Sequence, residues 1–202
     1  MKRARSTALR WSSTTPPALL RVPCCGTISE EPMPESPVTV EERAAAIDLY
    51  NAYAEGVDTK NWGMVRSCFA DTVYIDYATG VHDRDPSDPW PADEWVEGIK
   101  AVINGFDLTR HIISNHRFRR DGDTVVCQAY LTADHIIWEN GVPEAPNAGP
   151  DELSRVVGEY TNRCALLDGR WRIVASKLVV AYSTGPDELF VTAMQRAAAI
   201  VE

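Results

Sequence analysis

The sequence predicts an α+β domain in which N-terminal helices pack on a strongly curved antiparallel or mixed β-sheet. Three observations support this fold class. Three amphipathic helical patterns and one short strand pattern lie between residues 39 and 106, and long strand patterns joined by tight turns follow them. Those strand patterns are about 10 to 14 residues long, against a usual 5 or 6, so the sheet must bend. A bent sheet closed by helices forms a cone with one open end, which is typical of a small-molecule pocket.

The chain divides into an N-terminal extension, residues 1–37, and a domain, residues 38–202. The extension is rich in Ser, Thr, Pro and Arg, a composition that cannot bury a hydrophobic core, so we expect it to be disordered. Residues 1–29 carry five basic side chains and no acidic one, which is similar to an organelle transit peptide. A plain tail or an over-extended start codon would have the same composition. We therefore expect a cytoplasmic location, with organelle targeting as the alternative.

Composition excludes several classes of function. The formal net charge is -9, and an acidic domain argues against nucleic acid or an anionic membrane as partner. No run approaches the roughly 18 to 20 apolar residues of a membrane span. The five cysteines stand at irregular positions without the spacing of zinc ligands, which indicates reduced thiols and no metal site.

The first helix begins with a capping box, in which Thr39 and Glu42 satisfy free amide groups of the first turn. Apolar residues then recur at helical spacing, and Gly56 is expected to end the helix. The face expected to be buried consists of Val40, Ala44, Ile47, Tyr50 and Ala54.

A shorter helix over residues 62–69, a strand over 72–77 and a loop over 79–91 follow. Pro91 then stands where a third helix tolerates proline, at its first turn. The apolar face of this helix consists of Trp95, Ile99, Val102, Ile103 and Phe106.

Two hairpins follow, each built on an Asp-Gly turn, at Asp121-Gly122 and at Asp168-Gly169. Their strands cover residues 111–119, 124–138, 155–167 and 170–183. A last helix over residues 187–201 closes the chain. Its inward face is expected to hold Leu189, Met194 and either Ala197 or Ala198.

Asp58 lies between the first two helices and is the strongest candidate for a chemical role. A carboxylate held between apolar helical faces needs a hydrogen-bonding or charged partner, and His111 is the best candidate downstream. The alternative is that Asp58 only caps the helix that starts near Asn61. A metal at His111 and His116 is disfavoured, because strand alternation sends these two side chains to opposite faces.

Residues 39 to about 183 resemble the SnoaL-like, or nuclear-transport-factor-2-like, α+β cone family. The closest pattern is that of its scytalone dehydratase-like branch, which also includes a dehydrochlorinase and a bile-acid dehydratase. The segments that carry the resemblance are Val57-Asp58-Thr59-Lys60-Asn61-Trp62, Tyr74-Ile75-Asp76-Tyr77, Thr109-Arg110-His111, Asp134-His135 and Leu167-Asp168-Gly169-Arg170-Trp171.

The resemblance implies four catalytic residues. Asp58 falls on the family's catalytic aspartate and His111 on its general base, so that an imidazole would take a proton while a buried carboxylate orients it. Tyr77 matches a tyrosine that donates a hydrogen bond to the substrate oxygen, although a phenol at a strand end is often a rim residue. His135 matches the general acid, although a histidine on an apolar face is more often a core residue.

The substrate-binding positions depart from scytalone dehydratase. Val57 stands where that enzyme has a tyrosine, Tyr160 where it has an asparagine and Gly158 where it has a serine. We therefore expect Val57, Tyr160 and Trp62 to contact a different substrate.

The resemblance implies a cofactor-independent lyase of the dehydratase type, acting on a small hydroxylated or polyketide-type molecule. A proton-transfer isomerase or polyketide cyclase would use the same Asp-His pair, and a non-catalytic small-molecule-binding protein is the alternative from another class. A homo-oligomer, trimer or dimer, is expected to form through the exposed face of the sheet.

Overall fold

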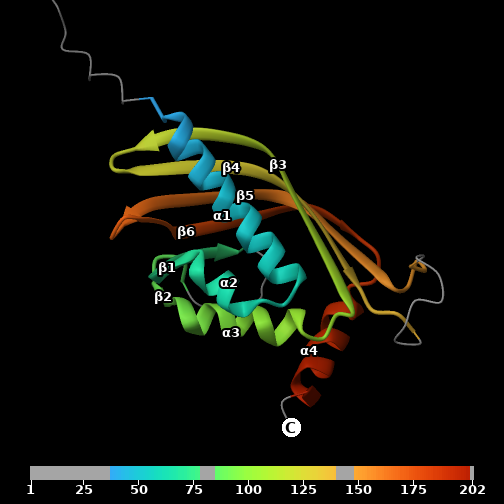
Figure 1. Ribbon diagram of the computed structural model, residues 1–202. Coiled ribbons are helices and arrows are strands. Elements are labelled where there is room, and N and C mark those ends of the chain that lie inside the picture. The colour runs from blue at the N-terminus through green and yellow to red at the C-terminus, as the bar shows by residue number, and fades with distance from the viewer. Residues whose placement is uncertain (1–36, 78–84, 140–147, 201–202) are drawn as a thin grey trace, which may run out of the picture. The chain divides into compact units, whose positions relative to one another are not determined.

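The computed structural model describes residues 37–77, 85–139 and 148–200 (Figure 1). Apart from Pro37, the expected N-terminal extension lies outside this range. Within it, helices pack on a six-stranded mixed sheet, so the predicted α+β fold class is confirmed. The helices are α1 (Val40–Asp58), α2 (Trp62–Ser67), α3 (Ala92–Ile103) and α4 (Glu188–Ile200). The strands are β1 (Phe69–Tyr77), β2 (Trp90–Pro91), β3 (Leu108–Asp121), β4 (Thr124–Ile136), β5 (Leu153–Leu167) and β6 (Arg170–Thr184).

The strand order is β2-β1-β6-β5-β4-β3. Strands β3 to β6 form the predicted antiparallel meander, and β1 joins it by parallel pairing with β6. Both Asp-Gly turns are present, with positive φ at Gly122 and Gly169. The short strand β2, which pairs with β1, replaces the end of the loop expected over residues 79–91.

Helix α1 lies across the concave face of the sheet, and the core fills the space between them (Figure 1). The buried side of α1 differs from the predicted one, because Val40 is 76% exposed and Ala44 is also exposed. The prediction is confirmed for Tyr50 and Ala54, which are buried, but the buried stripe is centred further round the helix. It consists of Ala46, Leu49, Tyr50, Tyr53, Ala54 and Val57.

Gly56 does not end α1, which continues to Asp58. The glycine is needed for close packing instead, since a Cβ at Gly56 would lie 2.8 Å from Cγ2 of Val65 in α2. The chain reverses at Lys60, and the side chain of Asn61 caps α2 by accepting a hydrogen bond from the amide of Met64. The alternative role of Asp58 as the cap of the second helix is therefore wrong.

A register shift in β3 changes which side chains face the core. Pairing with β4 is interrupted between Ser114 and Arg117, and Asn115 between them has a φ of 55°. The extra residue restores His116 to the face that carries His111, and the His116 ring packs edge-on against Tyr50 of α1 at 5.5 Å. The prediction that the two histidines point to opposite faces is therefore wrong.

Helix α4 packs against α3, close to the start of β3. A Cβ at Gly105 would lie 1.8 Å from the carbonyl oxygen of Ala193, so only glycine allows this approach. Leu189 and Ala197 are buried as predicted. Met194, the third residue predicted to face inward, is 46% exposed, and its neighbour Ala193 is fully buried instead. Among the described residues, no helix combines the length and hydropathy required to span a membrane.

Candidate active site

Asp58 is the last residue of α1, and its side chain is only 7% exposed. Its Oδ1 atom lies 2.7 Å from Nδ1 of His111 and accepts a hydrogen bond from the hydroxyl of Thr109 at 2.9 Å. Its Oδ2 atom accepts the backbone amide of His111 at 2.9 Å. The end of α1 and the start of β3 therefore meet at this one carboxylate.

The hydrogen bonds decide the charge of Asp58. Burial alone raises the pKa of this carboxyl group, but the side-chain and backbone hydrogen bonds from His111 and the Thr109 hydroxyl outweigh it. The pKa of Asp58 therefore lies below its ordinary value, and the group is ionised at neutral pH. The guanidinium of Arg110 is 3.9 Å away and mostly exposed, so it adds little.

The Asp58 carboxylate fixes the tautomer of His111. An ionised carboxylate only accepts hydrogen bonds, so the proton on the neutral imidazole must sit on Nδ1. Nε2 of the neutral ring then carries the lone pair.

His135 lies beside this pair, on β4 directly opposite Thr109. Its ring is 5.6 Å from the His111 ring and contacts Phe106 at 5.0 Å and Phe190 at 4.9 Å. Its Nδ1 atom is buried without a hydrogen-bond partner among the described residues. Burial, and next the nearby His111, lower the pKa of His135 to about 4. His135 is therefore neutral near pH 7, where it can donate a hydrogen bond but does not hold the extra proton of a general acid.

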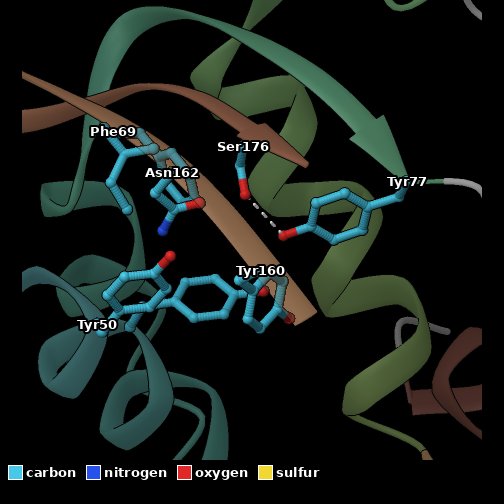
Figure 2. A pocket seen from close by; sticks show the side chains of 8 residues that line it. Tyr50, Phe69, Tyr77, Tyr160, Asn162 and Ser176 are labelled. Carbon is cyan, nitrogen blue, oxygen red and sulfur yellow. Dashed lines mark hydrogen bonds between the residues drawn. The ribbon is translucent and has the colours of Figure 1, made fainter. Parts of the chain in front are cut away.

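Tyr77 and Tyr160 lie in a separate small pocket (Figure 2). The empty space between its lining atoms, open solvent included, is about 180 Å³, and as the side chains stand it has no room for a water-sized molecule. The Tyr77 hydroxyl shares a hydrogen bond of 3.2 Å with Ser176. Burial raises the pKa of both tyrosines, so their hydroxyls stay protonated. The lining residues are Tyr50, Tyr53, Phe69, Tyr77, Tyr160, Asn162, Ile173 and Ser176.

The structure thus divides the predicted catalytic residues into two groups. Asp58, His111 and His135 contact one another or lie ring to ring, but none of them lines the tyrosine pocket. In β4, Ala133 pairs with His111 and Ala129 pairs with Tyr160. These two alanines are four residues apart on one face of one strand, a spacing of roughly 13 Å. Both groups therefore face α1 from the concave side of the sheet.

The other expected substrate contacts are placed differently. Val57 is 1% exposed and belongs to the hydrophobic core, and Trp62 packs against that core at the start of α2. Neither lines the tyrosine pocket. At Gly158 a Cβ would lie 2.4 Å from the carbonyl oxygen of Val179, so the serine of scytalone dehydratase does not fit this backbone.

Three polar residues of the site were missed by the sequence analysis. Thr109 lies two residues before His111, and Asn162 two residues after Tyr160, so strand alternation could have placed both on the concave face. Ser176 lies opposite Asn162 in the β5–β6 register, which no sequence signal shows. Among the described residues, no group of three or more His, Cys, Asp or Glu side chains could hold a metal ion.

Helices packed on a six-stranded mixed sheet are the arrangement of the NTF2-like cone fold. The model of the SnoaL-like domain matches residues 38–177, so the chain belongs to the SnoaL-like family. A search among curated proteins finds no significant match.

Several solved structures share this fold. A Kribbella flavida protein is 23% identical with a TM-score of 0.59, covering 78% of this chain and 97% of its own. A candidate scytalone dehydratase from Novosphingobium aromaticivorans is 18% identical with a TM-score of 0.55, covering 73% of this chain and 89% of its own. The hexachlorocyclohexane dehydrochlorinase LinA-type3 from Novosphingobium barchaimii is 18% identical with a TM-score of 0.54, covering 73% of this chain and 92% of its own. These similarities show the fold alone.

Proposed function

We propose that this protein is a cofactor-independent lyase of the dehydratase type, with Asp58 and His111 as its catalytic pair. The observation that carries the proposal is the 2.7 Å contact between Asp58 Oδ1 and His111 Nδ1 in a buried setting. This contact leaves Nε2 of His111 free to act as a base. The names of two fold neighbours, a candidate scytalone dehydratase and a dehydrochlorinase, favour an elimination.

In the proposed reaction, Nε2 of His111 removes a proton from a carbon next to a carbonyl or on an activated ring. The C–H electrons form the new double bond, and the neighbouring C–O bond breaks. The Asp58 carboxylate stabilises the imidazolium that forms. That imidazolium then returns its proton to the departing hydroxide, which leaves as water. This cycle regenerates neutral His111 and needs no second charged acid, in agreement with the low pKa of His135.

The chemistry of the pocket supports an uncharged substrate. Its lining consists of phenols, an amide, a hydroxyl and apolar side chains, with no basic residue to pair with a carboxylate or phosphate. Tyr77 and Tyr160 are buried there as protonated hydrogen-bond donors. Their hydroxyls can donate hydrogen bonds to the oxygens of a small hydroxylated or polyketide-type carbonyl compound.

A proton-transfer isomerase or polyketide cyclase remains the alternative within catalysis, because the same pair would perform the proton step. The two reactions differ in whether water is lost. A non-catalytic small-molecule-binding protein is the alternative from another class.

The test is a screen of β-hydroxy carbonyl compounds and hydroxylated aromatic ketones in D₂O, followed by mass spectrometry and NMR. Loss of water identifies a dehydratase, whereas deuterium incorporation or bond migration without mass loss identifies an isomerase. Asp58→Asn and His111→Gln should each reduce turnover by about 10²- to 10⁴-fold. Asp93→Asn, at an exposed carboxylate, is the matched control. Full activity in Asp58→Asn would exclude the catalytic pair, and binding without turnover would favour the binding protein.

A further inference from the structure

Lys60 has an unusual backbone conformation two residues after Asp58. Its φ is 56°, in the left-handed region that glycine and asparagine occupy most easily. A lysine there costs on the order of 1 kcal/mol in backbone strain. The end of α1 accounts for this conformation, because the amides of Lys60 and Asn61 bond back to the carbonyl oxygens of Val57 and Gly56, a helix ending that requires a left-handed residue. The contacts of the Lys60 side chain are a separate observation.

The Lys60 side chain reaches across to the turn between α3 and β3. Its Nζ atom donates a hydrogen bond to the carbonyl oxygen of Phe106 at 2.8 Å and contacts that of Asn104 at 3.4 Å. Removal from water lowers the pKa of this partly buried ammonium group, but the nearby Asp107 opposes the shift. The lysine thus bonds two main-chain carbonyl oxygens just beyond the end of α3, where helix carbonyls lack partners within the helix.

These bonds connect the same two segments that form the catalytic pair. Residues 58–60 contribute the Asp58 carboxylate and the Lys60 ammonium, and residues 104–111 contribute the groups that bind them. Along the second segment, two carbonyls contact Lys60, and then Thr109 and His111 donate to Asp58. Lys60 therefore holds the turn that directly precedes the two donors of Asp58.

The same turn also supports the second histidine. The carbonyl that receives the shorter Lys60 bond belongs to Phe106, whose fully buried ring contacts the His135 ring. Displacement of this turn would therefore move the start of β3 and the ring that packs on His135 together.

We propose that Lys60 is a positioning residue for the Asp58–His111 pair. Its ammonium group fastens the turn before β3 to the end of α1, so that the carboxylate meets both Nδ1 and the amide of His111. The inference rests on the pair that the proposed function uses, but it concerns the geometry of that pair and not the reaction. A purely structural cap of α3 would change stability and leave the tautomer of His111 as it is.

The test measures which ring nitrogen of His111 carries the proton, by long-range ¹H–¹⁵N NMR at mildly alkaline pH. Wild type should show protonated Nδ1. In Lys60→Met the population should shift toward protonated Nε2, the form that free histidine favours. Lys60→Gly relieves the backbone strain, so it should fold at least as well as Lys60→Met and still show the shift. Lys60→Arg keeps a cationic donor and should restore protonated Nδ1.

The matched control is Lys100→Met, because Lys100 lies on α3 and, among the residues that the structure describes, its ion pair is with Glu97 on its own helix. Its spectrum should match wild type. A folded Lys60→Met and Lys60→Gly with the wild-type tautomer would overturn the proposal. A tautomer shift in Lys60→Met supports the positioning role even if no screened compound is turned over. Failure of the proposed function is therefore distinguishable from failure of this proposal.

Discussion

The carboxylate of Asp58 receives both the ring nitrogen and the backbone amide of His111, so one side chain fixes the rotamer and the strand position of its partner together. The amide bond locates the start of β3 relative to α1, and the ring bond selects the tautomer. A substitution at Asp58 should therefore affect stability and chemistry through separate bonds, which makes the two effects measurable apart.

In Asp58→Asn the free energy of unfolding should depend less on pH in the acid range than it does in wild type. The folded-state pKa of Asp58 lies below its ordinary value of 3.8, so its contribution to stability is present above that pH and is lost as pH falls through the folded-state pKa. At neutral pH the substitution should lower the free energy of unfolding by about 1.5–3 kcal/mol, because charged hydrogen bonds are lost. Urea unfolding of both proteins across the acid range measures this. A gap that stays constant below about pH 4 would contradict the assigned charge.

His135 should destabilise the protein as pH falls from about 6.5 to about 4. Its folded-state pKa is lowered from 6.5 to about 4, so the unfolded chain binds the proton first. The free energy of unfolding should drop by about 3 kcal/mol across this window. In His135→Phe this part of the slope should vanish, which thermal or urea unfolding against pH would measure. An unchanged slope in the variant would show that His135 is not buried in its neutral form.

Asn162→Leu should stabilise the free protein. The Asn162 side chain is buried in the tyrosine pocket, and its Oδ1 atom has no hydrogen-bond partner among the described residues. An unsatisfied buried carbonyl costs about 1–3 kcal/mol, so an apolar side chain of similar size should raise the free energy of unfolding by about 1 kcal/mol. Ser176→Ala, which removes the bond to Tyr77, should lower it by a similar amount. Destabilisation by both substitutions would mean that Asn162 is satisfied in solution.

The outer face of the sheet should mediate self-association. Ile112 of β3, Tyr130 of β4, and Val179 and Tyr182 of β6 are each about half exposed there. We expect the double substitution Val179→Lys and Tyr182→Lys to shift the protein toward monomer in sedimentation velocity. Val191→Lys, at an equally exposed apolar residue of α4, should leave the distribution unchanged. A wild-type protein that sediments as a monomer would exclude this interface.

The sequence predicts the elements of this fold better than their contacts. The Asp-Gly turns, the capping box at Thr39 and the long alternating strands depend on local chemistry, and each is present. Gly56 was misjudged because a tight helix crossing and a helix end both require glycine, and only the position of α2 distinguishes them.

The site was predictable to a smaller extent. The resemblance pointed to Asp58 and His111 as partners, whereas the bulge at Asn115 depends on a backbone conformation that several residue types could adopt. The separation between His111 and the tyrosine pocket could not be predicted, because it depends on the pairing of β4 with strands on both sides.

Because β3 is an edge strand of the sheet, Asp58 also affects whether another chain can pair with it. An edge strand of 14 residues offers unpaired amides to any other extended chain, which is a common route to aggregation. One of the amides of β3, that of His111, is already bonded to the carboxylate of Asp58 at the end of α1. The carboxylate that bonds the ring of His111 therefore also removes one free amide at which another strand could pair with the sheet.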